Sequence, residues 1–425
     1  MSSAHDKSQH CLLPSVIGIW GGGLVGLTTA AFFAQKGVKS IIVDIDEDLI
    51  SRINSACFEP RFESWIGFNV KQHVTNGNIW ATNNHSQLCR AAVKTHFVAV
   101  TTETCGDPDM SAIYAVLEKI QTMSPELCII ECTVVPGTVE LLSRQYDIPL
   151  GIAGRRDLFL TGNNSLESCV RVFAGTSAEV SKRMHMVLSV VCKTLIQASS
   201  CKVVELTKVL DNAIFHTMAM FASQVASAYP SSDVTEAFAL AATHWRLGNH
   251  TYFPSLGTGG HCVPLANKYL IQGAQRPEQL SIAAQSIHYN DINPAGVAGY
   301  VKGRLEPGGC VAVLGICFRG DIREHTESPH LKFARELVKL GVSVAVHDPY
   351  YSEDELKDIC GGGSLRFPQD LRKFDFLGQS ILDNQGIWEA LSEDAKDLGI
   401  SYRRVGRVDW LPAITDYEEQ EKKEV

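Results

Sequence analysis

The chain has 425 residues, of which 45% are hydrophobic and 20% charged, and its formal net charge is −9. This length predicts two to three domains of roughly 150 residues each, and the apolar fraction excludes a disordered or low-complexity chain. The acidic balance argues against nucleic acid or an anionic membrane as a partner. No apolar run approaches the ~18 residues that span a bilayer, and the first residues do not resemble a signal peptide, so we expect a cytoplasmic protein.

The thirteen cysteines are scattered along the chain without a C-x-x-C pair. Zinc-ribbon spacing is absent, so no metal site is expected, and the odd number argues against a closed disulfide framework. We expect most of these cysteines to be small buried hydrophobic residues of a reducing compartment.

In the first half of the chain, short β-branched segments alternate with helical stretches. The predicted strands are Val16–Trp20, Ser40–Val43, Phe97–Val100 and Cys128–Glu131. This βαβ pattern predicts a parallel, doubly wound α/β sheet.

The first strand runs directly into a glycine-rich turn followed by a small-residue helix. This turn satisfies G-x-G-x-x-G, in which glycines allow a pyrophosphate to approach the backbone and the helix N-terminus offers free N–H groups. The predicted cofactor-binding residues here are Gly21, Gly23, Leu24, Val25 and Gly26. The alternative is a glycine-rich turn in an α/β domain that binds something else or nothing.

Further cofactor contacts are predicted at the carboxyl ends of the next strands. Asp44 ends the second strand and is placed to accept hydrogen bonds from a ribose diol, which favours NAD over NADP. Thr102 and Thr133 follow the third and fourth strands, where ligands bind in open α/β sheets, although ordinary turn chemistry would explain them equally.

Near residue 200 the pattern changes, because residues 203–226 are apolar almost all the way around a helix. Such a helix must be buried on every side, within the protein or in a subunit interface. The next helix is predicted to begin with Asp233 as N-cap and Glu236 three residues later. A strand at Val311–Leu314, a helix at Pro329–Leu340 and a strand at Val342–His347 then predict a second α/β domain.

Two groups of residues carry further chemistry. Glu205, Lys208 and Asn212 share one face of the apolar helix, and a Lys/Asn pair can stabilise a developing alkoxide; the alternative is a Glu205–Lys208 pair on a solvated stripe. Gly259 and Gly260 precede His261 and Cys262, so substrate can approach the thiol closely, and Cys262 is either a nucleophile or a buried structural residue.

These motifs together resemble the UDP-glucose/GDP-mannose dehydrogenase family, from Val16 to about Pro349 and in the family's order. The segment Gly259 to Cys262 is more similar to the branch that acts on UDP-N-acetylhexosamines. The resemblance implies an N-terminal NAD domain, a central helical dimerisation region and a C-terminal domain that binds UDP. We therefore predict two Rossmann-like doubly wound domains, over residues 1–198 and 301–425, joined by a central helical domain over residues 199–300.

The chemistry that the resemblance implies is oxidation of a sugar C6 alcohol in two hydride transfers to NAD. Cys262 adds to the intermediate aldehyde, Lys208 and Asn212 stabilise the oxyanion, and water releases a carboxylate from the thioester. The resemblance also assigns Gly259, Gly260 and Arg319 to the substrate. The resemblance further implies a role in polysaccharide biosynthesis.

The chain departs from the family at several proton-handling and phosphate-binding positions. An Asp four residues after the cysteine is Ala266 here, and the family's Pro-Glu-Arg segment becomes Arg155-Arg156-Asp157, which leaves Asp157 as the only candidate for the hydrolytic carboxylate. Phe-Lys becomes Phe318-Arg319, and the Arg before Glu-Ser-Pro becomes Thr326.

The leading prediction is an NAD-dependent 6-dehydrogenase of a UDP-sugar, acting as a homodimer on a UDP-N-acetylhexosamine. A second hypothesis is a single or reversible oxidation, such as aldehyde formation or epimerisation, with retained NAD. A third is a nucleotide-sugar-binding protein without turnover. β-Hydroxyacid dehydrogenases share the glycine turn and the Lys-x-x-x-Asn helix, but they do not need the Cys262 segment.

Overall fold

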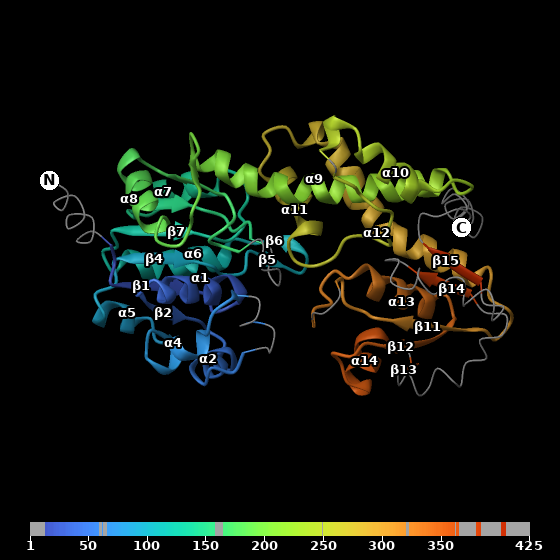
Figure 1. Ribbon diagram of the computed structural model, residues 1–425, viewed down its shortest axis with the longest axis horizontal. Helices are drawn as coiled ribbons and strands as arrows, with labels where there is room; N and C mark the ends of the chain where they lie inside the picture. The colour runs from blue at the N-terminus through green and yellow to red at the C-terminus, as the bar shows by residue number, and fades with distance from the viewer. Residues whose placement is uncertain are drawn as a thin grey trace. The chain divides into compact units, whose positions relative to one another are not determined.

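The computed structural model describes residues 13–58, 62, 66–157, 165–248, 250–319, 323–361, 363–364, 380–383 and 401–404. The chain divides into two compact units, residues 1–210 with 272–275, and residues 211–271 with 276–425 (Figure 1).

An eight-stranded sheet lies at the centre of the described part of the first unit (Figure 1). Its strands in chain order are β1 (Val16–Trp20), β2 (Lys39–Val43), β3 (Ile79–Thr82), β4 (Thr95–Val98), β7 (Leu127–Ile130), β8 (Leu150–Ile152), β9 (Arg171–Gly175) and β10 (Leu195–Gln197). Their spatial order is β3-β2-β1-β4-β7-β8-β9-β10, and neighbours are parallel except β8 and β9. The first six strands have the order of a dinucleotide-binding fold, whose ligand lies at the carboxyl ends of the strands.

Helices cover both faces of this sheet, which explains why its strands are near-continuous apolar runs. One face packs against α1 (Leu24–Gln35), α2 (Glu47–Asn54), α4 (Val70–Thr75) and α8 (Ala178–Leu188). The other packs against α5 (Ser86–Arg90), α6 (Ser111–Gln121), α7 (Thr138–Gln145) and the start of α9 (Cys201–Ala228). A short antiparallel pair, β5 (Glu103–Thr104) and β6 (Asp107–Pro108), follows β4.

The second unit combines helices with a small parallel sheet. Its helices are the rest of α9, α10 (Val234–Ala242), η2 (Trp245–Leu247), α11 (Val263–Gln272), η3 (Pro277–Gln279), α12 (Ser281–Lys302), α13 (Pro329–Lys339) and α14 (Glu353–Cys360). β11 (Cys310–Leu314), β12 (Ser343–His347) and β13 (Gly363–Ser364) form the sheet, and β14 (Ser380–Asp383) pairs with β15 (Ser401–Arg404). The apolar faces of α12 and α13 pack together with β11 and β12 in one core.

The predicted elements agree with the structure to within two residues at each end, and Asp233 caps α10 as predicted, accepting the Glu236 N–H at 2.8 Å. The sequence predicts that the long helix α9 is buried on every side, either within the protein or in a subunit interface, and the first alternative is wrong. Ile214, Phe215 and Phe221 on α9 are 55%, 45% and 49% exposed, so the chain alone does not bury this helix on every side. The division into three domains stays a prediction, and within the described residues no helix is long and apolar enough to cross a membrane.

Candidate active site

The glycine turn between β1 and α1 has the geometry that a dinucleotide requires. Gly21 has a φ of +98°, and a Cβ atom at this position would lie 2.4 Å from the carbonyl oxygen of Ala99. A Cβ atom at Gly23, by contrast, would meet nothing within 4 Å, and no side chain caps the start of α1 there. The helix N-terminus is therefore open to a pyrophosphate, and this part of the chain fits NAD.

Asp44 holds the turn from the neighbouring strand. Its Oδ2 accepts the N–H of Gly22 at 2.5 Å, and its Oδ1 accepts the N–H of Asp46 at 2.9 Å. The carboxylate is thus fixed at the carboxyl end of β2, where the sequence predicts the ribose contact. Each oxygen still has lone-pair capacity for a further donor.

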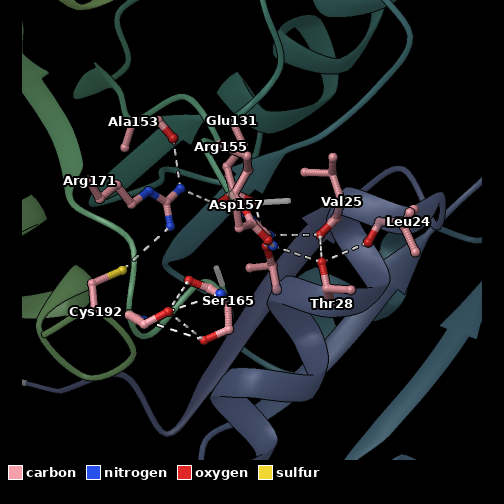
Figure 2. A network of polar contacts seen from close by, with 12 residues as sticks. Leu24, Val25, Thr28, Glu131, Ala153, Arg155, Asp157, Ser165, Arg171 and Cys192 are labelled. Atoms are coloured by element: carbon pink, nitrogen blue, oxygen red, sulfur yellow. Dashed lines mark hydrogen bonds and ion pairs between the residues drawn. The ribbon is translucent and has the colours of Figure 1, made fainter. Parts of the chain in front are cut away.

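A buried polar network joins Arg155 to the first turns of α1 (Figure 2). Arg155 Nε and Nη2 donate to the two carboxylate oxygens of Asp157 at 2.8 and 2.6 Å. Nη1 also donates to the Val25 carbonyl at 3.1 Å and to Thr29 Oγ1 at 2.6 Å, and Nη2 donates to Thr28 Oγ1 at 2.9 Å. These five contacts engage all five N–H groups of the guanidinium.

The predicted hydrolytic carboxylate, Asp157, is held inside this network. Its side chain is 1% exposed. Burial by itself would raise the pKa of Asp157, but the hydrogen bonds and charge of Arg155 outweigh it and leave the pKa below its usual value. Both oxygens therefore accept hydrogen bonds from a cation and are shielded from water, an arrangement that favours a structural ion pair over a base.

The network continues across the sheet through Glu131, which follows β7. Glu131 Oε2 accepts the hydroxyl of Thr29 at 2.7 Å, and its other oxygen forms an ion pair with Arg171 on β9. Arg171 also donates to the carbonyl of Ala153 at 2.7 Å (Figure 2). The carboxyl ends of β7 and β8 are thereby tied to the cofactor helix. Sequence reasoning missed Glu131, Arg171 and the function of Arg155, because partners up to 130 residues apart leave no local pattern.

The loop that contains Thr133 is fixed by Glu205. The Glu205 carboxylate accepts the N–H of Gly137 at 2.6 Å and that of Val139 at 2.7 Å, which caps the start of α7. Burial raises the pKa of Glu205 despite these hydrogen bonds. The predicted alternative of a solvated Glu205–Lys208 pair is therefore wrong: Glu205 is 1% exposed and bonds to backbone.

Lys208 and Asn212 lie one turn apart on α9, and both are partly buried. Carbon atoms of the Lys208 side chain would lie 3.2 to 3.5 Å from a Cβ atom at Gly154, so this glycine leaves room for the lysine. Thr102 is buried after β4, and Thr133 is partly buried after β7. Lys208 belongs to the first unit, whereas Asn212 and Cys262 belong to the second.

Cys262 differs from most cysteines of the chain because it is exposed. It immediately precedes α11, and the preceding His261 lies with Nε2 3.7 Å from Glu324 Oε2. Burial raises the pKa of Cys132 and Cys201 to about 12, which makes them poor nucleophiles. Cys57, Cys89 and Cys105 are the other exposed thiols in the described residues. The expectation that most cysteines are buried is thus only partly met, and the alternative of a buried structural Cys262 is wrong.

The segment before Cys262 packs against the loop after β11. Cβ atoms at Gly259 and Gly260 would lie 2.5 and 2.8 Å from atoms of Phe318, so only glycines allow this close approach. The N–H of Gly260 donates to the carbonyl of Thr326 at 2.8 Å. Arg319, the predicted substrate residue, follows Phe318 and is exposed.

Comparisons with known proteins agree with this geometry. The chain matches the NAD-binding, central and UDP-binding domains of the UDP-glucose/GDP-mannose dehydrogenase family over residues 15–147, 202–291 and 312–376. It is 27% identical to the UDP-N-acetyl-D-mannosamine dehydrogenase of Pyrococcus horikoshii, over 92% of this chain and 99% of that protein. It is 26% identical to a UDP-glucose 6-dehydrogenase of Pseudomonas aeruginosa, over 77% and 78%.

The solved structures support the predicted fold. A UDP-glucose dehydrogenase from Pyrobaculum islandicum superposes with a TM-score of 0.81 at 20% identity, covering 93% of this chain and 98% of that one. Because all three domain models match in order and together cover most of the chain, the predicted α/β class and the NAD cofactor are confirmed. The chain belongs to the UDP-glucose/GDP-mannose dehydrogenase family of NAD-dependent oxidoreductases.

Proposed function

We propose that the protein oxidises the C6 alcohol of a UDP-N-acetylhexosamine to the uronate through a covalent intermediate on Cys262. The observation that carries the proposal is the exposed Cys262 at the end of a glycine segment that packs against the UDP-binding domain. The names of relatives, among them UDP-N-acetyl-D-mannosamine dehydrogenases, support the substrate class.

The thiol, the two oxyanion donors and the substrate-binding residues each have a definite task in this proposal. NAD, when bound, would supply the hydride acceptor for the two oxidations at C6. Cys262 supplies a thiolate that forms a C–S bond to the aldehyde carbon, and Lys208 and Asn212 donate hydrogen bonds to the oxyanion. Loss of the second hydride leaves a thioester, and water then breaks the C–S bond to give the carboxylate and the free thiol. Gly259, Gly260 and Arg319 contact the nucleotide sugar.

A second candidate, a single or reversible oxidation, is favoured by the state of the carboxylates. Asp157 is sequestered by Arg155, and the position four residues after Cys262 is the buried methyl group of Ala266. A thioester needs a group that activates water. If neither position supplies one, the thioester is not hydrolysed, and turnover then requires that the aldehyde is released after the first oxidation or that this oxidation is reversed.

We also propose that the protein acts as a homodimer in the cytoplasm. Ile214, Phe215 and Phe221 of α9 and Ile282 of α12 are exposed in the single chain, and α9 and α12 line an open hollow between Met218 and Gln285. A second copy of the same face would remove these apolar side chains from water. Light scattering of wild type and of Phe221→Glu tests the dimer: we expect twice the chain mass for wild type and the mass of one chain for the variant.

The free thiols of the described residues agree with the proposed reducing compartment.

The decisive experiment counts NADH formed per sugar consumed, with NAD and a panel of UDP-hexoses and UDP-N-acetylhexosamines. Two NADH per sugar supports the full oxidation, and one supports the arrested reaction. Turnover without net NADH indicates internal redox recycling. Failure to bind any UDP-sugar would overturn the proposal. Cys262→Ser must abolish the second NADH; two NADH from this variant would exclude the thioester route.

A further inference from the structure

The loop of residues 255–260, which leads to Cys262, is anchored by side chains of two helices. From α12, Asn293 Nδ2 donates to the carbonyl oxygens of Ser255 at 3.0 Å and Leu256 at 2.9 Å. From α9, Ser223 Oγ accepts the N–H of Ser255 at 3.1 Å. The side chains of Asn293 and Ser223 therefore fix the start of the loop through its backbone groups, so these contacts do not depend on the side chains of the loop.

Thr258 is the centre of a second, tighter set of contacts. Asn290 Oδ1 on α12 accepts the Thr258 N–H at 2.8 Å, and His216 Nδ1 on α9 lies 2.6 Å from Thr258 Oγ1. His216 is fully buried, and burial lowers its pKa to about 4, so the ring is neutral at neutral pH. Thr258 is thus held by its backbone and its hydroxyl at once.

The glycines around Thr258 make these contacts necessary. Gly257 has a φ of +155°, and a Cβ atom there would lie 2.7 Å from Asn290 Oδ1, so the amide fills the space of a side chain. Gly260 has a φ of +84°. A glycine-rich segment has a large conformational freedom, which only outside contacts restrict.

We infer that His216 and Asn290 are positioning residues that hold Thr258, and through it the segment Gly259 to Cys262, in the one conformation that presents the Cys262 thiol. This inference rests on the proposed role of Cys262. Neither residue touches the reacting atoms in this account. Both act on the rate because a displacement of about 1 Å of a reacting group costs up to ~100-fold in rate.

The test uses matched substitutions. Thr258→Val removes the hydroxyl without changing the shape of the side chain, and Thr258→Ser restores it. Thr235→Val on α10 is the control, because the buried Thr235 Oγ1 has no hydrogen-bond partner among the described residues. Hydrogen exchange of the peptide over residues 255–262 and steady-state kinetics with NAD and the UDP-sugar are measured for each variant.

We expect Thr258→Val to speed exchange in this peptide and to lower kcat about 10- to 100-fold, with KM for NAD changed less than about twofold. Thr258→Ser must recover kcat, and Thr235→Val must resemble wild type. The rate of alkylation of Cys262 is measured by mass spectrometry, with Cys57, Cys89 and Cys105 as internal references. This rate must change in Thr258→Val and return to the wild-type value in Thr258→Ser.

Several results would overturn the inference. Faster exchange with an unchanged kcat and unchanged Cys262 alkylation would show that the anchoring serves packing alone. If Thr258→Val does not fold, the pair His216→Leu and His216→Asn replaces it, since Asn keeps a polar atom near the position of Nδ1; equal activity of the two rejects the inference. Two NADH from Cys262→Ser would instead reject the proposed function, while the exchange and alkylation results would still report on the anchoring.

Discussion

The carbonyl oxygen of Gly21 occupies the place that a side chain at Gly26 would need: a Cβ atom at Gly26 would lie 1.9 Å from it. The last glycine of the motif therefore serves contact between the turn and α1. Gly23 has the opposite environment, with open space around its missing Cβ atom and an extended φ of −61° with ψ of −175°.

This contrast predicts that a substitution at Gly26 lowers stability, whereas one at Gly23 weakens NAD binding. Gly26→Ala should lower the free energy of unfolding by about 2 kcal/mol or more, because overpacking forces the backbone apart. Gly23→Ala should leave the thermal midpoint nearly unchanged and weaken NAD binding at least about tenfold, because the methyl group stands where the pyrophosphate approaches. Calorimetry and NAD titration check both. Normal NAD affinity in Gly23→Ala would contradict the cofactor assignment at this turn.

The Arg155–Asp157 pair predicts a strong asymmetry between single and double substitutions. Arg155→Ala leaves a buried carboxylate without its cation and should cost about 3–5 kcal/mol, whereas Arg155→Met with Asp157→Leu should cost clearly less. Urea unfolding of both variants measures this. If the Arg155 substitution alone is nearly neutral, the network does not hold α1 as described.

The contacts of the Glu205 carboxylate at the start of α7 predict that its substitutions lower the free energy of unfolding by different amounts. Glu205→Ala leaves the partly buried N–H of Gly137 and the buried N–H of Val139 without their acceptor and should cost about 2–4 kcal/mol, since each unsatisfied group costs roughly 1–3 kcal/mol. Glu205→Gln keeps one acceptor oxygen and should cost less. Because the loop before α7 carries Thr133, the alanine variant should also weaken NAD binding. Equal stability of the two variants would argue against capping.

His96 on β4 predicts a loss of stability in acid. It is fully buried, and Trp20 Nε1 donates to its Nδ1 at 3.4 Å. Burial, with a smaller contribution from Lys94, lowers the pKa of His96 from 6.5 to about 4. The unfolded chain therefore takes up a proton that the folded chain refuses, so this contribution is present above pH 6.5 and is lost as the pH falls toward 4.

The thermal midpoint, measured from pH 7.5 to pH 5, should fall in wild type and fall less in His96→Gln. The exposed His288→Gln is the control and should follow the wild-type curve. Burial also lowers the pKa of His216 to about 4, so this residue contributes a similar fall in the thermal midpoint. The slope of the midpoint against pH in His96→Gln should therefore be reduced and not abolished. An identical slope in wild type and His96→Gln would contradict this account.

The sequence by itself determined the elements and their chemistry. The apolar strands, the glycine turn with Asp44, the cap at Asp233 and the glycines before Cys262 are local patterns, because each depends on dihedral angles and neighbours within a few residues. Tertiary structure alone decided what buried polar groups bind. Arg155, Glu205 and His216 find partners through packing between distant segments, and burial makes those partners necessary since an unpaired polar group in the interior costs several kcal/mol. The sequence indicated a carboxylate at Asp157, and only the fold showed that Arg155 holds it while it also binds the first turns of α1.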